Sequence, residues 1–220
     1  METQLIKVHN LKRYYKKVKA VDGLSYVFEP GQEYAIQGSS GSGKSTLLYM
    51  LGGLDRPTDG IIEVGGNDLG QYSDDQLAIF RNRYVGFVFQ FHFLLPSMTC
   101  LENILLPSKI GGLKGNLIEK KVVDLSQKLG VEHCLKKHPY EVSGGEQQRI
   151  NIIRALSLGP KLLLCDEPTG NLDSENSQIV TELIRSLAKE YNSTLVVVTH
   201  DDNVASQFTN RIRIRDGRLL

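Results

Sequence analysis

The sequence predicts an α/β fold with a mainly parallel β-sheet, and three features of the chain indicate this class. Two apolar runs rich in β-formers, 162–165 and 194–199, each follow a segment with the pattern of a helix. Such alternation is typical of parallel strands joined by crossover helices. A third strand, over 33–37, stops at a glycine-rich segment, after which 45–51 is expected to be a helix. The length of 220 residues is sufficient for one large domain with a sizeable core.

Shorter elements with turn signals complete the expected order. Gly65-Gly66 follows an apolar run and indicates one arm of a hairpin. The last ten residues alternate strictly and then carry an Asp216-Gly217 turn signal, which predicts an antiparallel hairpin. The other expected elements are strands over 4–8 and about 22–28 with a polar turn between them, a strand over 61–64, a helix over 73–82 and a strand over 85–89.

The stretch from about 91 to 142 is expected to be a helical insert. Within it, 116–129 has apolar residues at helical spacing, and Gly130 follows as a C-terminal stop. We therefore expect a single domain over 1–220. It has an α/β core, an antiparallel β subdomain on its N-terminal side, and an α-helical subdomain over about 91–142.

Composition excludes several classes of protein. The formal net charge is +1, with 40% hydrophobic and 23% charged residues, so a disordered chain and a nucleic-acid partner receive little support. No apolar stretch reaches the roughly 20 residues of a membrane-spanning helix, and the start lacks the pattern of a signal peptide. We expect the chain to stay in the cytoplasm. Three scattered cysteines, Cys100, Cys134 and Cys165, argue against a disulfide framework or a zinc site, and Cys165 is expected in the core.

A phosphate-binding loop is the strongest motif, and it matches the pattern G-x-x-x-x-G-K-[ST]. It consists of Gly38, Ser39, Ser40, Gly41, Ser42, Gly43, Lys44, Ser45 and Thr46. Glycines let the backbone wrap around an anion, and the following helix adds the positive end of its dipole. Lys44 can reach the β- and γ-phosphates of ATP, and the Ser45 hydroxyl can ligate Mg²⁺. The loop therefore predicts a P-loop NTPase, although a Gly/Ser-rich turn has a similar composition.

Two carboxylates end the apolar strand over 162–165. In P-loop enzymes an acid at this place holds Mg²⁺, which suits Asp166. Glu167 could then accept a proton from the attacking water as a general base. The alternative is a pair of solvated acids at a strand end, and the nearby phosphate loop favours the functional interpretation.

A third motif runs through Ser143, Gly144, Gly145 and Glu146. Ser143 with Glu146 forms the pattern of a capping box, which predicts that a helix starts here. The capping box does not explain two glycines in the first helical turn, because each costs nearly 1 kcal/mol. That cost favours a functional requirement for the two glycines.

These motifs together resemble the nucleotide-binding domains of ABC transporters, and the resemblance covers essentially the whole chain. The segment Val142-Ser-Gly-Gly-Glu146 is similar to the family signature L-S-G-G-Q, with Val142 and Glu146 as departures. The resemblance implies a RecA-like core, and it implies that Ser143, Gly144 and Gly145 contact ATP bound on a partner copy.

Further positions are assigned by the resemblance alone. Gln90 matches the glutamine that senses Mg²⁺ and the attacking water, and His200 matches the histidine that contacts the γ-phosphate. Asn171-Leu172-Asp173 matches the loop that crosses the dimer interface. Tyr15 matches the aromatic residue that stacks on adenine, with Tyr14 as its rival.

The resemblance also implies the working assembly. Two copies would form an ATP-dependent, head-to-tail homodimer on the cytoplasmic face of the inner membrane, bound peripherally to integral membrane permease subunits. The groove after Gln90, with the apolar residues of 91–96, is the expected permease contact. The alternative is that some of these residues belong to the core. Segments such as Gly52-Gly-Leu-Asp55 and 86–96 are similar to the group containing LolD, MacB and FtsE, and 90–96 is most similar to LolD. Lipoprotein release is thus expected, with export or resistance of the MacB type and signalling of the FtsE type as alternatives.

Two further classes are less compatible with the sequence. Soluble ABC ATPases of translation carry two such domains in one chain, and those of DNA repair carry a long coiled coil between the phosphate loop and Asp166. The 122 positions from Lys44 to Asp166 hold no sustained heptads (166 − 44 = 122). A nucleoside kinase would have no use for the segment 142–149.

Overall fold

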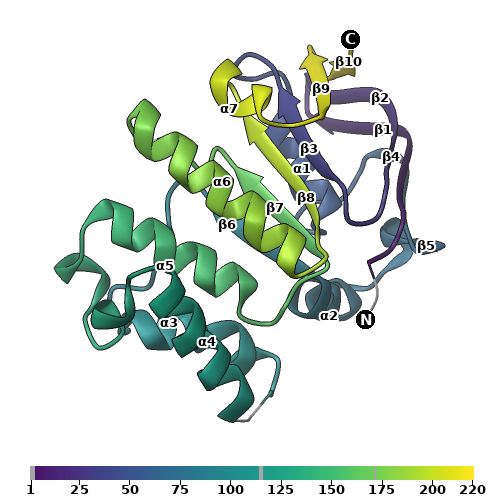
Figure 1. Cartoon of the computed structure of the whole chain (residues 1–220). Helices are drawn as coiled ribbons and strands as arrows, with labels where there is room; N and C mark the ends of the chain where they lie inside the picture. Colours follow the sequence, from purple (N-terminus) through teal and green to yellow (C-terminus); the bar gives the residue numbers. More distant parts are fainter. Residues whose placement is uncertain (1–2, 114–115, 171) are drawn as a thin grey trace.

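The computed structural model describes residues 3–113, 116–170 and 172–220, and it contains two β-sheets with helices around them (Figure 1). One sheet has the order β2-β1-β4-β5, and the other has the order β10-β9-β3-β8-β7-β6. The antiparallel sheet comprises β1 (Ile6–Tyr15), β2 (Val18–Phe28), β4 (Asp59–Val64) and β5 (Asn67–Asp68). The main sheet comprises β3 (Glu33–Gln37), β6 (Val85–Phe89), β7 (Leu162–Asp166), β8 (Thr194–Thr199), β9 (Asn210–Arg215) and β10 (Arg218–Leu219).

Two neighbouring inner strands of the main sheet, β7 and β8, are buried on both faces. Every residue of β7 and β8 is buried, which matches the continuous apolar runs that the sequence shows there. Alternate residues face two different cores. Leu163 and Val197 belong to the core that also contains the apolar faces of the later helices. Leu164 and Val196 belong to the core shared with the first helix and the antiparallel sheet. The predicted α/β class is confirmed.

Seven α-helices and three short 3₁₀ segments are present in the described residues. The α-helices are α1 (Lys44–Leu51), α2 (Asp74–Tyr84), α3 (Cys100–Ile110), α4 (Asn116–Lys128), α5 (Gly144–Leu156), α6 (Ser174–Glu190) and α7 (Asp202–Ser206). The 3₁₀ segments are η1 (Leu69–Gln71), η2 (Glu132–Cys134) and η3 (Pro139–Glu141). In Figure 1, α3, α4 and α5 gather on one side of the main sheet, away from the antiparallel sheet. Among the described helices, none is both long and apolar enough to cross a bilayer.

At the two ends of the chain, one expectation needs correction and the other is confirmed with an addition. The first two strands extend well beyond 4–8 and 22–28, and the turn between them is only Lys16-Lys17. Register shifts in the β1–β2 ladder break the simple alternation, and this explains why the pattern hid the strands. At the other end, β9 and β10 do form the expected hairpin, with positive φ at Asp216 and Gly217. In addition, β9 pairs in parallel with β3 and so becomes part of the main sheet.

Candidate nucleotide-binding site

Most of the candidate residues follow the carboxyl ends of parallel strands. In the ladder, Gln37 of β3 pairs with Thr199 of β8, and Phe89 of β6 pairs with Asp166 of β7. The loops that leave these strands therefore start at one edge of the sheet, where ligands of open α/β sheets bind. The phosphate loop, Glu167, His200 and Gln90 are the segments that leave β3, β7, β8 and β6 in this way.

The phosphate loop connects β3 to α1, as the motif predicts. Lys44 begins α1 and is only 6% exposed, yet its ammonium group makes two contacts inside the loop. Nζ donates hydrogen bonds to the carbonyl oxygens of Gly38 at 2.8 Å and Ser39 at 2.9 Å. The positive charge is thereby held within the loop and beside the helix N-terminus, a position suited to attract phosphate oxygens.

Glycine is required at two positions of this loop. Gly43 has φ of 101°, and a Cβ there would lie 2.0 Å from the carbonyl oxygen of Ala20. A Cβ on Gly38 would lie 2.2 Å from the carbonyl oxygen of Ile214. The loop also holds a buried hydroxyl, Ser42 Oγ, that has no hydrogen-bond partner among the described residues. A buried hydroxyl without a partner is costly, so an oxygen-rich ligand at the loop would satisfy it.

Ser45 and Asp166 are brought into direct contact. Ser45 Oγ donates a hydrogen bond of 2.8 Å to Asp166 Oδ1, although the two residues are 121 positions apart. The other carboxylate oxygen, Oδ2, accepts a 2.7 Å bond from the Tyr49 hydroxyl. Burial, followed by the hydrogen bond to Asp166, raises the pKa of Tyr49. A hydroxyl and a carboxylate side by side are oxygen donors of the kind that Mg²⁺ prefers.

Glu167 and His200 form the second pair at this edge. His200 Nδ1 lies 2.9 Å from Glu167 Oε1, and the backbone N–H of His200 approaches Oε2 at 3.4 Å. Glu167 has φ of 47°, a left-handed conformation that is rare for a non-glycine residue. Its backbone N–H donates to the Val198 carbonyl at 3.0 Å, which holds this conformation in place. Strained backbone of this type clusters at functional sites.

Gln90 lies where β6 ends, in contact range of Gly170. A Cβ on Gly170 would approach the Gln90 amide nitrogen to 2.7 Å. Gln90 also lines a small pocket of about 130 Å³ together with Gly144 and Gly145 at the start of α5. The structure thus brings the glutamine and the signature glycines of the same chain to one pocket. Gly38, Ser39 and His200 line a different pocket, of about 360 Å³.

The signature segment begins α5 with the predicted capping box. Ser143 is the N-cap, and its N–H donates to Glu146 Oε2 at 2.7 Å. Glu146 Oε1 lies 2.8 Å from Nε2 of His133, so this carboxylate already has a partner in the same chain. Hydrogen bonds from Ser143, Cys134 and His133 lower the pKa of Glu146 to about 2. The space beside the Gly144 Cα is open, because a Cβ there would meet no atom within 4 Å among the described residues.

Tyr15 ends β1 and is 41% exposed, with its ring held at two points. Its hydroxyl hydrogen-bonds Asp55, and the guanidinium of Arg13 lies 4.4 Å from the ring centroid. Tyr14 instead directs its hydroxyl to Asp22. Asp55 thus connects Tyr15 to the loop after α1, and Arg13 joins it through a 2.7 Å ion pair.

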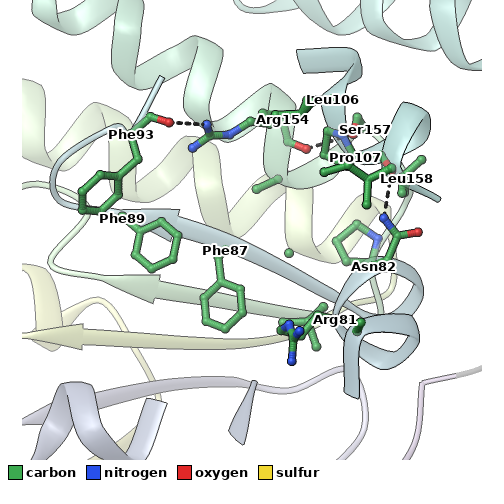
Figure 2. Close-up of a pocket in the computed structure, with 16 residues that line it drawn as sticks. Arg81, Asn82, Phe87, Phe89, Phe93, Leu106, Pro107, Arg154, Ser157 and Leu158 are labelled. Carbon is green, nitrogen blue, oxygen red and sulfur yellow. Dashed lines mark hydrogen bonds between the residues drawn. The ribbon is translucent and has the colours of Figure 1, made fainter. Parts of the chain in front are cut away.

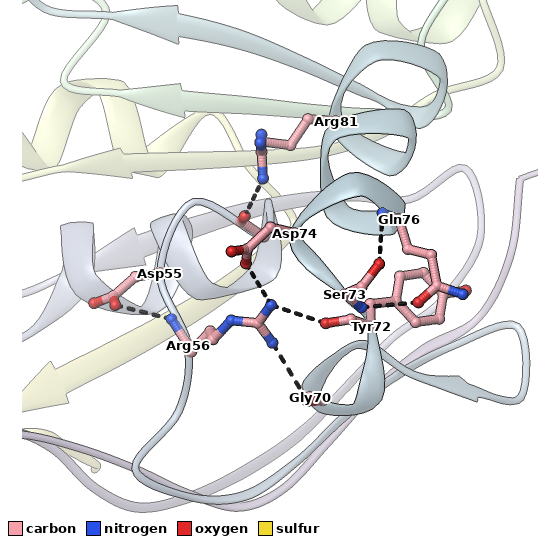
Figure 3. A network of polar contacts seen from close by, with 9 residues as sticks. Asp55, Arg56, Gly70, Tyr72, Ser73, Asp74, Gln76 and Arg81 are labelled. Atoms are coloured by element: carbon pink, nitrogen blue, oxygen red, sulfur yellow. Dashed lines mark hydrogen bonds and ion pairs between the residues drawn. The ribbon is translucent and has the colours of Figure 1, made fainter.

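The Asp55 loop is itself anchored to α2 (Figure 3). The Arg56 backbone N–H donates to Asp55 Oδ1 at 2.8 Å, and the Arg56 guanidinium donates to the Tyr72 carbonyl and to Asp74 Oδ1, each at 2.8 Å. Arg81 of α2 holds the start of the same loop, because it donates to the Gly53 carbonyl at 2.8 Å. These contacts give the Tyr15 hydroxyl a fixed acceptor.

The expected interface loop can be followed only in part, because Asn171 lies outside the described residues. Asp173 is the N-cap of α6, and its Oδ1 accepts a 2.8 Å hydrogen bond from the Asn176 N–H. This bond is the main cause of the lowered pKa of Asp173. The local capping role is sufficient to explain the aspartate within one chain.

Comparisons with known proteins agree with this geometry. Residues 21–170 match the model of the family described as ABC transporter. The chain belongs to the ABC transporter family. Membership confirms the resemblance inferred from the sequence and, with it, the assignment of the chain as an ATPase subunit. The fold prediction of a P-loop core with antiparallel β and helical parts is confirmed by the solved structures described next.

The similar proteins match this ABC subunit over nearly its whole length. A lipoprotein-releasing system ATP-binding protein LolD from Geobacter metallireducens is 44% identical over 99% of both chains. A protein of the same name from Cytophaga hutchinsonii is 38% identical over 99% of both chains. The dimeric ABC transporter cassette MJ0796 superposes with a TM-score of 0.89 at 36% identity, covering 97% of this chain and 96% of that one. A post-hydrolysis form of MJ0796 bound to ADP and Pi gives 0.88 at 35% identity, with the same coverage.

Sequence reasoning missed two groups that support the ABC site. Tyr49 lies four positions after Ser45 on α1, so helical spacing places both on one face toward Asp166, and this signal was available in the sequence. Asp55 carried no such signal, because its contacts to Tyr15 and Arg13 bridge a loop and a strand.

Proposed function

We propose that this chain is the ATPase of a lipoprotein-releasing transporter of the LolD type, bound peripherally to permease subunits at the cytoplasmic face of the inner membrane. The observation that carries the proposal is the match of the whole chain, at 44% identity, to a protein of that name. The grouping of the phosphate loop, Asp166, Glu167 and His200 at one sheet edge supports the ATPase chemistry on which such a function depends.

The chemistry follows from the two pairs at this edge. The loop and Lys44 would bind the β- and γ-phosphates, while Ser45 and Asp166 would hold Mg²⁺. The family resemblance adds Gln90 to these metal ligands. The metal would offset the negative charge that builds up on the phosphates. Glu167 would take the proton of the attacking water, and His200 would hold the Glu167 carboxylate in place and approach the γ-phosphate.

A composite site between two copies completes this proposal. Gly144 and Gly145, which follow Ser143, line a pocket that does not include the phosphate loop. Two head-to-tail copies would place each signature helix N-terminus on the nucleotide of the other, where the dipole favours the γ-phosphate. Asp173 would then lie near the interface. ATP binding would favour the closed dimer, as a ligand that binds one state better than the other.

The permease is proposed to dock on an apolar groove between α2, β6, α3 and α5 (Figure 2). Its cavity measures about 420 Å³, and Phe87, Phe89 and Phe93 line it in a row. Arg154 donates to the Phe93 carbonyl at 2.8 Å and to the His92 carbonyl at 2.6 Å. Burial lowers the pKa of Arg154 to about 10, so the guanidinium stays charged at neutral pH. Ile110, which also lines the groove, is 72% exposed, and such exposed apolar surface marks an interaction site.

Replacing Ile110 with aspartate tests the groove. The introduced charge would have to be desolvated in the complex, so co-purification with the membrane subunits should be lost while the ATPase activity of the isolated chain is kept. Ile179→Asp on α6 is the matched control, since Ile179 is also an exposed isoleucine but does not line the groove. If Ile110→Asp co-purifies with the membrane subunits as well as Ile179→Asp does, this groove is not the docking site.

Replacing Asp55 with asparagine is expected to raise KM for ATP several-fold with little change in kcat. The substitution weakens the acceptor that fixes the Tyr15 hydroxyl, and a loss of uniform binding raises KM alone. Steady-state ATPase kinetics check this, with Asp75→Asn, an exposed aspartate on α2, as the control. An unchanged KM would contradict the role of Tyr15 in adenine binding.

The cargo is tested in cells. Expressing Glu167→Gln in place of the parent chain in its own organism should trap lipoproteins in the inner membrane, which fractionation and labelling of acylated proteins would detect. If lipoproteins are still sorted normally in a strain whose only copy of this chain is the inactive Glu167→Gln variant, that result would contradict lipoprotein release and favour export of another substrate.

A further inference from the structure

Three potential metal ligands converge behind the N-terminus of α5. His133 and Cys134 come from η2, and Glu146 comes from the first turn of α5. His133 Nε2 lies 2.8 Å from Glu146 Oε1 and 3.4 Å from Cys134 Sγ. All three donor atoms lie within 4.8 Å of one another. The spacing of the cysteines along the sequence predicted no zinc site, and it is the fold that creates this cluster.

The local structure holds these ligands before any ion binds. Glu146 Oε2 accepts hydrogen bonds from the N–H and the hydroxyl of Ser143, both at 2.7 Å, which leaves Oε1 directed toward His133. The Cys134 thiol hydrogen-bonds the same carboxylate. Cys134 is fully buried, the Glu146 side chain is 19% exposed and the His133 side chain is 58% exposed. The cluster is therefore anchored inside and open to solvent on the histidine side.

A cysteine, a histidine and an acid also suggest a thiol nucleophile, but the geometry excludes this. The same imidazole nitrogen approaches both the thiol and the carboxylate, whereas a proton relay uses one nitrogen for each. The thiol has no exposed surface through which a substrate could reach it.

We propose that His133, Cys134 and Glu146 bind one zinc ion. Thiolate, imidazole and carboxylate are the donors that zinc takes in proteins, and their usual bond lengths put S and N about 3.5 Å apart and N and O about 3.3 Å apart at tetrahedral angles. The observed 3.4 Å and 2.8 Å need only a small opening of the histidine–glutamate contact. One thiolate and one carboxylate also balance the two charges of the ion.

Binding changes the protonation of two ligands. Cys134 gives its thiol proton to solvent and binds as the thiolate. His133 offers the lone pair of Nε2 and carries its proton on Nδ1. A water molecule from solvent would complete the coordination on the exposed side at His133. The ion would join η2 to the Ser143–Glu146 capping box, so it would fix the helix start that carries the signature.

Cobalt titration of the metal-stripped, nucleotide-free protein tests the site. A thiolate-to-cobalt charge-transfer band should appear, saturate at one ion per chain and disappear when Zn²⁺ is added. The thiolate band separates this site from any ion held by Ser45 and Asp166, which offer oxygen alone. Zn²⁺ should also raise the melting temperature of the parent.

Variants assign the ligands. Cys134→Ser should abolish the band, and Glu146→Gln, which keeps a capping-box residue at this position, should weaken Co²⁺ binding by about 10- to 100-fold or more. His138→Asn and Cys100→Ser are the controls from the same lobe and should leave the titration unchanged. Absence of the band in the parent, or an unchanged titration in both Cys134→Ser and Glu146→Gln, would overturn the proposal.

Discussion

Replacing Glu167 with glutamine should lower the ATPase rate by about 10² to 10⁴, the range that a general base contributes. Glutamine has nearly the same size and keeps a hydrogen-bonding group near His200, but its amide cannot accept the proton of the attacking water. The contact with His200 Nδ1 at 2.9 Å and the left-handed backbone of Glu167 show that the carboxylate is held in a fixed place. Phosphate release under saturating Mg-ATP measures the effect.

The control for this experiment is Glu182→Gln, on the exposed face of α6. It removes the same charge from the same chain and should leave turnover unchanged. Nucleotide affinity should persist in Glu167→Gln, because the phosphate loop is intact. A Glu167→Gln variant that hydrolyses ATP at the parent rate would exclude Glu167 as the base and direct attention to His200.

Replacing Lys44 with alanine is the second large effect that we expect, and it acts on binding. Each hydrogen bond to a charged group contributes about 1.5–3 kcal/mol, so loss of the ammonium should weaken ATP binding by about 10- to 150-fold. Lys44 Nζ also holds the carbonyl oxygens of Gly38 and Ser39, so the loop loses its internal clamp. Calorimetric titration with ATP measures the affinity.

Lys16→Ala, in the turn between β1 and β2, is the control for charge alone. Circular dichroism should show that Lys44→Ala is folded, since the core clusters do not depend on this side chain. If the folded Lys44→Ala variant binds ATP as tightly as the parent, the loop is not the phosphate site.

The inner part of the main sheet could be predicted because two of its strands have uniformly apolar surroundings. Strands β7 and β8 are buried on both faces, and the resulting apolar runs marked them within one residue. The antiparallel sheet was harder, because β1 shifts register three times against β2 and loses its alternation. The parallel pairing of β9 with β3 joins residues some 176 positions apart (210 − 34 = 176), and no local pattern reports it.

The candidate site also has parts that the sequence predicts and parts that only the fold reveals. The phosphate loop, Asp166 and the capping box are contiguous motifs, and the structure places them at the predicted strand and helix ends. The roles of Gln90, His200 and Asp173 rested on family resemblance and stay predictions. The Asp55 contact with Tyr15 and the cluster of His133, Cys134 and Glu146 arise only from tertiary packing. Sequence spacing carries no information about such contacts.

The composite site between two copies is the central claim, and light scattering of Glu167→Gln with saturating Mg-ATP tests it most directly. The molar mass should double on adding Mg-ATP, because bound nucleotide would join the phosphate loop of one copy to Ser143 of the other. Adding Ser143→Arg to the same chain should keep it monomeric while leaving ATP binding intact. A dimer that persists with Ser143→Arg, or a Glu167→Gln chain that binds Mg-ATP and stays monomeric, would contradict the account.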